Sequence, residues 1–397
     1  MPIRYRTDLP QTTQLAIVGG GVVGAATAFY AARAGLKPLL IERRPRLCTL
    51  TTPVSTGAFR LQFDNREELE IVRRSVELFL TFAESTGQRE HDLDVRQQGY
   101  LFLTTDEIGV DRQRRIVAAL HEWGQSDVEL LDGDETRRRF PYIAENVLQA
   151  RFRAGDGFLD PKALTIGLAA GADAEVVTAC TVTGLRIAGG RLTAVDTDRG
   201  VVSTEAAVIA AGPLSGLVAD RAGVRLPIDT VRRHKIVMPV VPEVPRWAPM
   251  TIDEDTGAHW RPALHGAYLL FTDPATPASP PAEHVIADPD FAFQLLDPES
   301  PVSVARVAPF WRQVWERGTA NWMLQAGQYT MTPDHRPLIG PTPVEGLYVN
   351  TGYSGHGIMG SPAGSRLLID VLTGKVPADD NPFRIDRAFV TAGLDIL

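Results

Sequence analysis

The arrangement of apolar and polar stretches predicts a strand, a glycine-rich turn, a helix and a second strand in the first 44 residues. The apolar runs at 15–18 and 38–41 are typical of buried strands. Between them, an apolar helix over 22–34 starts directly after glycines spaced G-x-G-x-x-G, and Gly35 ends it. This order is half of a Rossmann unit, which favours a dinucleotide-binding protein.

Each glycine of this turn has its own task. Gly19 permits the tight turn, Gly21 lets the backbone approach a pyrophosphate, and Gly24 lets the helix pack closely on the strand. Val22 and Val23 lie at the helix N-terminus, where free N–H groups and the positive end of the helix dipole attract phosphate. These five residues are therefore expected to bind the cofactor.

An acidic residue closes the second strand. Glu42 stands 18 residues after Gly24, where its carboxylate can accept both hydroxyls of an adenosine ribose. Arg43 and Arg44 follow directly and keep NADP open as an alternative cofactor, because an arginine suits a ribose phosphate. This unit alone does not distinguish FAD from NAD.

A loop of small polar residues comes next. Its hydroxyls and backbone amides can lie against a flat ring system, although an ordinary surface loop is an equally good alternative. The loop residues that we expect at the cofactor are Thr51, Thr52, Ser55, Thr56 and Gly57. Asn65 and Glu68 then form a capping box, which predicts a helix beginning at that point.

The middle of the chain alternates between two structural regions. From Gly99 onward, short apolar runs alternate with helical stretches, which is typical of an α+β region. A buried strand near 206–210 ends at Ala211 and Gly212, and we expect it to return to the nucleotide-binding sheet beside the cofactor. Between 225 and 321 the chain leaves that sheet again, and aromatic residues gather there.

Composition narrows the class of protein by exclusion. With 397 residues, 44% of them hydrophobic and 22% charged, the chain can bury a large core and form two domains. A net charge of -8 argues against a nucleic-acid partner. We see no signal peptide and no apolar run that could span a bilayer, and therefore expect a cytoplasmic protein. Two cysteines and scattered histidines predict no metal site.

A second glycine-rich segment, 352–359, lies more than 300 residues after the first and precedes an apolar helix. If a flavin ring lies at the mouth of this helix, the amides of Gly357 and Ile358 can donate to its C2 carbonyl and N1. Negative charge develops at these atoms when the flavin takes up a hydride, and a helix N-terminus stabilises that charge. The two segments together predict one cofactor held at both ends.

These segments resemble the FAD-dependent D-amino-acid oxidase and sarcosine oxidase superfamily across nearly the whole chain. The resemblance is carried by the N-terminal glycines, Thr-Gly-Ala-Phe-Arg at 56–60, the strand end at 210–212, Met-Thr-Pro-Asp at 331–334 and Gly-Tyr-Ser-Gly-His-Gly at 352–357. It implies an α/β fold in which a Rossmann-like FAD-binding domain is interleaved with an α+β substrate domain on a mixed β-sheet. The expected FAD-binding domain covers 1–90, 150–222 and 325–397, and the expected substrate domain covers 91–149 and 223–324.

The resemblance also implies a chemistry and a set of cofactor contacts. Members of this superfamily remove a hydride from the carbon beside an amine nitrogen, and the resulting imine hydrolyses in water. By position, the glycine turn and Glu42 match the pyrophosphate and ribose contacts, and the backbone at Val182 matches an adenine contact. The segment that matches the flavin-ring contacts consists of Gly355, His356, Gly357, Ile358 and Met359.

Three side chains are candidates for contact with the substrate. Arg60 occupies the place of an arginine that, in sarcosine oxidases, helps hold the substrate carboxylate, although it could instead tie down its own loop. His356 could sit near the flavin, but the resemblance favours its backbone as the ligand. Tyr268, like Trp260, could face the substrate or be a structural aromatic.

Departures from the superfamily change the expected cofactor linkage and substrate. Gly327 stands where monomeric sarcosine oxidases have the cysteine that bonds the flavin, and no histidine follows Glu42, so we expect noncovalent FAD. Met359 replaces a lysine that pairs with the substrate carboxylate, and Tyr268 or Leu269 replaces a lysine that assists oxygen. These losses weaken the sarcosine assignment and favour a dehydrogenase over an oxidase.

The function expected from the sequence is FAD-dependent oxidation of an N-methyl amino acid, proline, glycine or a D-amino acid, with oxygen or another electron acceptor. An alternative is a flavoprotein subunit or assembly factor of a larger complex, in which FAD is mainly structural. A weaker alternative is a Rossmann enzyme that uses NAD. Homo- and hetero-oligomers both remain open.

Overall fold

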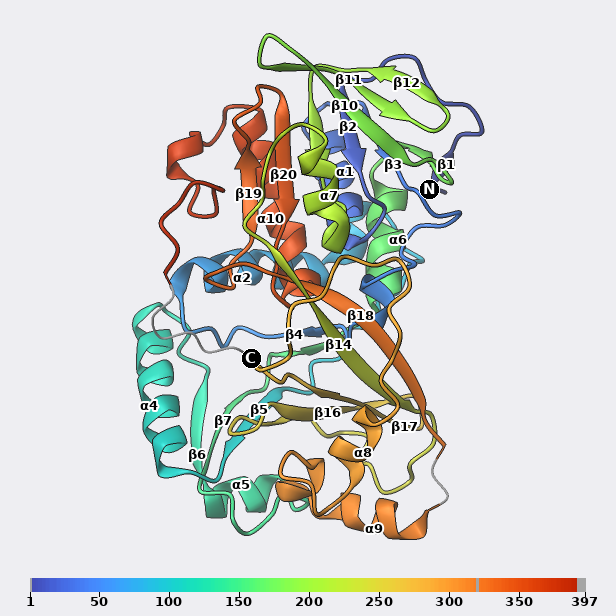
Figure 1. Ribbon diagram of the computed structural model, residues 1–397. Coiled ribbons are helices and arrows are strands. Elements are labelled where there is room, and N and C mark those ends of the chain that lie inside the picture. Colours follow the sequence, from blue (N-terminus) through green and yellow to red (C-terminus); the bar gives the residue numbers. More distant parts are fainter. Residues whose placement is uncertain (1, 319–320, 391–397) are drawn as a thin grey trace.

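The computed structural model describes residues 2–318 and 321–390 and arranges them in two stacked parts (Figure 1). The upper part contains a seven-stranded sheet in the order β1-β9-β3-β2-β13-β20-β19, in which only the last pair is antiparallel. Its strands are β1 (Arg4–Tyr5), β9 (Glu175–Val177), β3 (Pro38–Ile41), β2 (Leu15–Val18), β13 (Ala207–Ile209), β20 (Leu347–Thr351) and β19 (Leu338–Pro341).

Helices cover one face of this sheet and a small second sheet covers the other. The first layer consists of α1 (Val22–Arg33), α6 (Pro161–Gly171), α10 (Gly357–Leu372), α2 (Arg66–Leu80) and α3 (Phe82–Thr86). The second consists of α7 (Ser215–Asp220) and the strands β10 (Val182–Ala188), β11 (Arg191–Thr197) and β12 (Gly200–Ser203). Strands buried on both faces are apolar throughout, which explains the unbroken apolar runs at β2 and β3.

The lower part is built on an eight-stranded sheet in the order β18-β14-β17-β16-β15-β5-β7-β6. All neighbours are antiparallel except β15 and β5. The strands are β18 (Met323–Met331), β14 (Asp229–Met238), β17 (Gly266–Phe271), β16 (Ala258–Ala263), β15 (Met250–Asp253), β5 (Tyr100–Thr104), β7 (Gln149–Arg153) and β6 (Glu129–Asp132). The predicted α/β fold with a mixed sheet is therefore confirmed.

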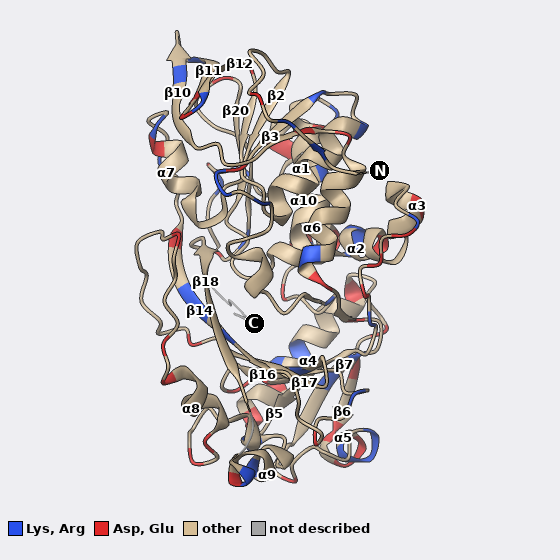
Figure 2. Ribbon diagram, turned by 90° about the vertical axis from the view of Figure 1, so that its right-hand side faces the viewer, with Lys and Arg blue, Asp and Glu red and all other residues tan. Residues whose placement is uncertain are grey.

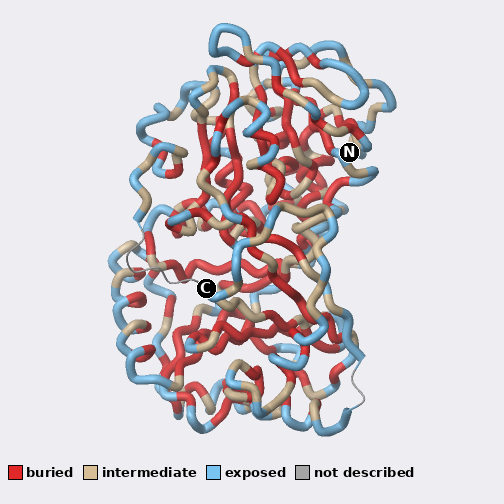
Figure 3. Tube along the Cα trace, viewed as in Figure 1, coloured by how far each residue is buried: buried red, intermediate tan, exposed pale blue. Residues whose placement is uncertain are grey.

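Helices pack beneath and beside the lower sheet, so that one sheet face is left toward the upper part (Figure 1). Buried side chains of β14, β16 and β17, such as Ile236 and Trp260, share a core with the helices below. The helices of this part are α4 (Glu107–Glu122), α5 (Gly133–Arg139), α8 (Phe291–Leu296) and α9 (Phe310–Arg317). Figure 3 shows buried chain at the centre of both parts and exposed chain around them.

Two strands cross the expected domain boundaries. β7 begins at Gln149 and β18 at Met323, and both belong to the eight-stranded sheet, although boundaries at 150 and 325 would assign most of their residues to the FAD-binding domain. Two short strands, β4 (Ala58–Phe59) and β8 (Gly157–Phe158), form a separate antiparallel pair. The long strands β14 and β18 run past the upper part into the lower sheet (Figure 1).

Candidate active site

One cavity of about 280 Å³ lies where the two parts meet. Its walls come from the glycine turn, the end of β3, the loop after it, the start of β10, the end of β13, the strands β14 and β18, and the segment before α10. The lining residues are 18–23, 41–44, 48–52, 54–55, 180–182, 210–214, 217–218, 221, 233–234, 270, 327–330, 351–355 and 357–358. Segments at the two ends of the sequence therefore meet in one cavity, as the sequence predicts.

The glycine turn is shaped to receive a ligand. A Cβ at Gly24 would lie 1.8 Å from the Gly19 carbonyl oxygen, and one at Gly19 would lie 2.4 Å from that of Ala210, so both glycines allow close packing of backbone. At Gly21 the nearest atom to an added Cβ is Thr52 Oγ1 at 3.3 Å, and the space beyond is the cavity. The N-terminus of α1 is thus open toward the cavity, where it can bind phosphate.

Glu42 lies in the cavity wall with its carboxylate held by two backbone amides. Oε2 accepts from Gly20 N at 2.6 Å, and Oε1 accepts from Arg44 N at 2.7 Å. Burial raises the pKa of this carboxyl, and the two amides oppose that rise. Each carboxylate oxygen keeps a further lone pair, so the group can still accept the two hydroxyls of a ribose.

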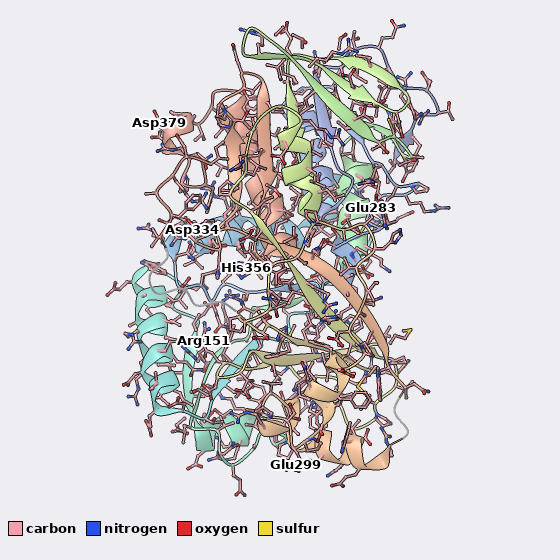
Figure 4. The ribbon with its side chains drawn as sticks, in the orientation of Figure 1. Arg151, Glu283, Glu299, Asp334, His356 and Asp379 are labelled. Carbon is pink, nitrogen blue, oxygen red and sulfur yellow. The ribbon has the colours of Figure 1, made fainter. Side chains whose placement is uncertain are left out.

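Arg43 and Arg44 line the cavity but direct their guanidinium groups to a neighbouring loop. Arg43 forms an ion pair with Glu283, and Arg44 donates to the carbonyls of Thr49 at 2.9 Å and Glu283 at 2.7 Å. Figure 4 shows Glu283 beside the upper part. Because both side chains have these partners, the structure favours a free ribose hydroxyl, as in FAD, over the ribose phosphate of NADP.

The segment before α10 forms the opposite end of the cavity. Gly355 has a φ of 99°, and a Cβ there would lie 2.7 Å from the Tyr329 ring, so this position needs glycine on both counts. Gly357 and Ile358, the first residues of α10, line the cavity. Their free amides form a second helix N-terminus at which negative charge is stabilised.

The His356 and Met359 side chains lie outside the cavity lining. The His356 ring contacts Glu68 Oε1 at 3.2 Å through Nδ1 and Arg60 Nη2 at 3.3 Å through Nε2, and Figure 4 shows it where the two parts meet. Met359 is buried in the apolar core. Neither side chain is in the cavity lining, which takes Gly352, Tyr353, Ser354, Gly355, Gly357 and Ile358 from this part of the chain.

Glu68 links that segment to α2. The predicted capping box is present: Asn65 Oδ1 accepts from Glu68 N at 2.9 Å, and the Asn65 amide donates to Glu68 Oε2 at 2.9 Å. Burial by itself raises the pKa of the Glu68 carboxyl, but His356, Asn65 and Arg60 together lower it. The carboxylate is therefore ionised at neutral pH.

Arg60, expected at the substrate, is engaged by protein groups. It is 3% exposed, donates to the Gln62 carbonyl and contacts His356. Its guanidinium also lies over the Phe63 ring at 4.6 Å and the Phe102 ring at 5.5 Å. Burial lowers its pKa. Arg60 is outside the cavity lining, which matches the alternative that it ties down its own region.

Tyr268 is also outside the cavity lining and lies between two cations. Its ring is 4.6 Å from Lys235 Nζ and 4.7 Å from the Arg261 guanidinium. Lys235 on β14 thus brings an ammonium to the position where the sequence predicted the loss of a lysine. That ammonium donates to the carbonyls of Pro53 and Ser55, each at 3.1 Å, and burial lowers its pKa to about 7.

Most of the expected cofactor residues line the cavity, and five do not. Those in the lining are Gly19, Gly21, Val22, Val23, Glu42, Arg43, Arg44, Thr51, Thr52, Ser55, Val182, Ala211, Gly212, Gly355, Gly357 and Ile358. Those outside it are Gly24, Thr56, Gly57, His356 and Met359. Gly24 and Gly57 serve close backbone packing instead, and the Thr56 carbonyl accepts from Arg261 Nε at 2.8 Å.

Sequence reasoning missed the residues that β14, β17 and β18 contribute. Arg233, Leu270, Gln328, Tyr329 and Thr330 line the cavity from the lower sheet. Alternation along each strand could have shown which of these side chains share a face, but the pairing of β14 with β18 is needed to bring them together.

The donor groups of this cavity fit a flavin dinucleotide. Two helix N-termini face opposite ends of it, a buried carboxylate stands at the ribose position, and glycines leave room for close approach of a ligand. The fold and the site thus define a protein of the dinucleotide-binding flavoprotein class. Residues 14–371 match the family described as FAD dependent oxidoreductase, DAO. The chain belongs to this family, and FAD is its cofactor.

Individual relatives agree with this assignment. The FAD-dependent oxidoreductase domain-containing protein 1 of Xenopus laevis is 27% identical, over 94% of this chain and 81% of that protein. Mitochondrial sarcosine dehydrogenase of Homo sapiens is 26% identical over 96% of this chain, which spans only 42% of the human protein. The crystal structure of L-proline dehydrogenase from P. horikoshii has a TM-score of 0.83 at 24% identity, covering 96% of this chain and all of that one.

Neither a membrane-spanning helix nor a group of metal-ligating side chains is present among the described residues. Within residues 2–318 and 321–390, no helix is long and apolar enough to cross a bilayer. In the same part of the chain, no three His, Cys, Asp or Glu side chains are grouped so as to hold a metal ion. The human relative is mitochondrial, so the expected cytoplasmic residence stays a prediction.

Proposed function

We propose that this protein oxidises an amino acid at the bond between its nitrogen and the adjacent carbon, and that the imine formed hydrolyses in water. Bound FAD supplies the chemistry by accepting a hydride. The observation that carries the proposal is the pair of free amides at Gly357 and Ile358, which open α10 at the cavity. A helix N-terminus at that position favours the negative charge of a reduced cofactor, which a purely structural FAD does not need.

In this proposal, the residues of the chain bind and orient the cofactor and enclose the cavity. The glycine turn and the N-terminus of α1 hold the pyrophosphate, Glu42 holds the ribose, and the segment before α10 holds the flavin by its backbone. Tyr329 closes the cavity against Gly355. No general base is required if the substrate amine binds in its neutral form. Likeness to a sarcosine dehydrogenase supports a secondary or primary amine of an amino acid as the substrate class.

An anaerobic amine panel tests this function. Sarcosine, dimethylglycine, L-proline, glycine and D-alanine are mixed in turn with the purified yellow protein, and flavin bleaching is followed by absorbance. Bleaching by at least one amino acid supports the proposal. Absence of bleaching by the whole panel, with normal FAD content, contradicts it and favours the alternative of a subunit with structural FAD.

We also propose an electron acceptor other than oxygen. Met359 is buried in the core and leaves no ammonium at that position. The Lys235 ammonium donates hydrogen bonds to the carbonyls of Pro53 and Ser55, and Lys235 lies outside the cavity lining. The resemblance assigns the assistance of oxygen to a lysine, and no lysine is among the described residues that line the cavity, so we expect a slow reaction with oxygen. Reoxidation of the reduced protein in air-saturated buffer should be slow, and fast peroxide-producing turnover would show that the protein is an oxidase.

A further inference from the structure

We propose that Arg233 binds the carboxylate of the substrate, a role that the sequence assigns to Arg60. The proposal rests on the proposed function and names the residue that would recognise the carboxylate of its amino-acid substrate. Arg233 lines the cavity from β14 and is 6% exposed. It is thus a buried guanidinium that reaches the same space as the predicted flavin site.

The strand places Arg233 on the sheet face toward the cavity. Side chains alternate along β14, so Arg233 and Lys235 share one face and their neighbours share the other. His234, on that other face, also belongs to the cavity lining, but its ring stacks on Phe291 at 4.6 Å. The contacts agree: Lys235 reaches the 53–55 loop, Ile236 lies in the core with the helices beneath the sheet, and Arg232 pairs with Asp288 at 3.8 Å outside the cavity. Across the ladder from Arg233 is Gly327, which has no side chain to fill the space in front of the guanidinium.

Within residues 2–318 and 321–390, two nitrogens of the Arg233 guanidinium group lack a hydrogen-bond acceptor. Among the described residues, neither Nε nor Nη1 of Arg233 has a hydrogen-bond acceptor, and no carboxylate comes within 4 Å of the group. The Tyr329 ring lies 5.9 Å away. Burial lowers the pKa of Arg233, while Tyr329 and Asp273 act from a distance to raise it. A buried charged donor without an acceptor is costly, and a bound carboxylate would satisfy two of its N–H groups at once.

Arg60 differs in each of these respects. It donates to the Gln62 carbonyl, contacts His356 and lies outside the cavity lining. No Arg60 nitrogen is left buried without a partner in the described structure. Binding a ligand would require Arg60 to give up these contacts, whereas Nε and Nη1 of Arg233 have no acceptor to give up among the described residues.

The charge around Arg233 favours an anion. Lys235 and Arg261 lie on the same face of the sheet, and within the described residues neither forms an ion pair. In the part of the chain that the structure describes, their donors reach backbone carbonyls only. Figure 2 shows blue segments along β14 and the strands beside it. An anionic group bound at Arg233 would offset part of this uncompensated charge.

Ligand binding without turnover tests the proposal. The FAD-loaded protein is titrated with acetate and with its neutral isostere acetamide, and the flavin difference spectrum gives the Kd. We expect acetate to bind and acetamide to bind far more weakly. Arg233→Gln should weaken acetate binding by about 10- to 100-fold, as expected for loss of hydrogen bonds to a charged group, and Arg233→Lys should restore part of it.

Arg232→Gln is the matched control, because it removes the same group from the opposite face of the same strand. It should leave the Kd for acetate unchanged. Equal acetate binding by the wild type and Arg233→Gln would overturn the proposal, and so would a loss confined to Arg60→Lys. If Arg233→Gln lowers FAD affinity but the FAD-loaded fraction still binds acetate normally, Arg233 serves the cofactor and the proposal is wrong.

The test of the carboxylate site and the test of the proposed function can fail independently. Arg233-dependent acetate binding in a protein that no amine bleaches would retain the anion site and reject the oxidoreductase. Conversely, bleaching by dimethylamine as efficient as bleaching by sarcosine would retain the oxidoreductase and reject the carboxylate site. The two proposals therefore fail by different measurements.

Discussion

Replacing Gly24 by alanine should separate α1 from the strand that it packs on. A Cβ at this position would lie 1.8 Å from the Gly19 carbonyl oxygen, whereas ordinary contacts begin near 3.4 Å. The obstacle is backbone and not a flexible side chain, and Gly24 has no positive φ, so the effect is one of packing alone. The helix must move away from the turn, which displaces the amides that face the cavity.

The expected magnitude follows from two opposing contributions. Overpacking of a rigid site costs about 1–3 kcal/mol, and the backbone obstacle places this variant at the upper end. Alanine regains up to about 1 kcal/mol over glycine by helix propensity. The net loss in the free energy of unfolding should therefore be roughly 2 kcal/mol, measured on the FAD-free protein by urea unfolding, and FAD affinity should fall as well.

Gly216→Ala provides the control. Gly216 also lies in a helix, α7, but an added Cβ there meets only Ile228 at 3.8 Å, an ordinary contact. This variant should be neutral or more stable by about 0.4–1 kcal/mol. If Gly24→Ala unfolds at the wild-type urea concentration and retains FAD, or if both variants lose the same stability, the packing argument is wrong.

Three further predictions concern the same site. Glu42→Gln should weaken FAD binding by about 10- to 100-fold in a fluorescence titration, because one amide oxygen cannot replace both carboxylate oxygens that accept from Gly20 and Arg44; unchanged affinity would contradict the ribose assignment. The pKa of the Glu68 carboxyl is lowered by folding, so this group stabilises the protein above its ordinary pKa of about 4.3, and the stabilisation is lost as the pH falls further. Glu68→Gln should therefore lower Tm at pH 7 and flatten the fall in Tm below pH 4.5. Parallel curves of Tm against pH for the variant and the wild type would refute this. Since Gly327 offers no thiol, acid precipitation should leave the yellow colour in the supernatant, and a yellow pellet would reveal a covalent bond.

The parts of the fold that the sequence predicts are those set by local signals. The order strand, turn, helix and strand over β2, α1 and β3 follows from apolar runs and glycine spacing, and the start of α2 follows from Asn65 and Glu68. The limits of β7 and β18 do not follow from such signals. Their strands join the lower sheet by pairing with β5 and β14, which are distant in sequence.

The same distinction holds for the site. Residues that act through backbone, such as Gly21 and Gly357, are predictable because glycine spacing reflects backbone geometry. The His356 ring contacts Glu68, 288 residues away, and Arg233 stands opposite Gly327 because β14 pairs with β18. Neither pairing leaves a trace in the local pattern.

The segment before α10 shows why cofactor and substrate specificity are carried by different surfaces. Its backbone faces the cavity, while its side chains fasten it elsewhere: His356 to Glu68, Met359 into the core, and the Tyr353 hydroxyl to Asn350 Oδ1 at 2.6 Å. A change such as methionine for lysine at 359 therefore leaves the flavin contacts intact. If Arg233 binds the substrate carboxylate as proposed, selection among substrates comes from β14, where Nε and Nη1 of Arg233 have no acceptor among the described residues.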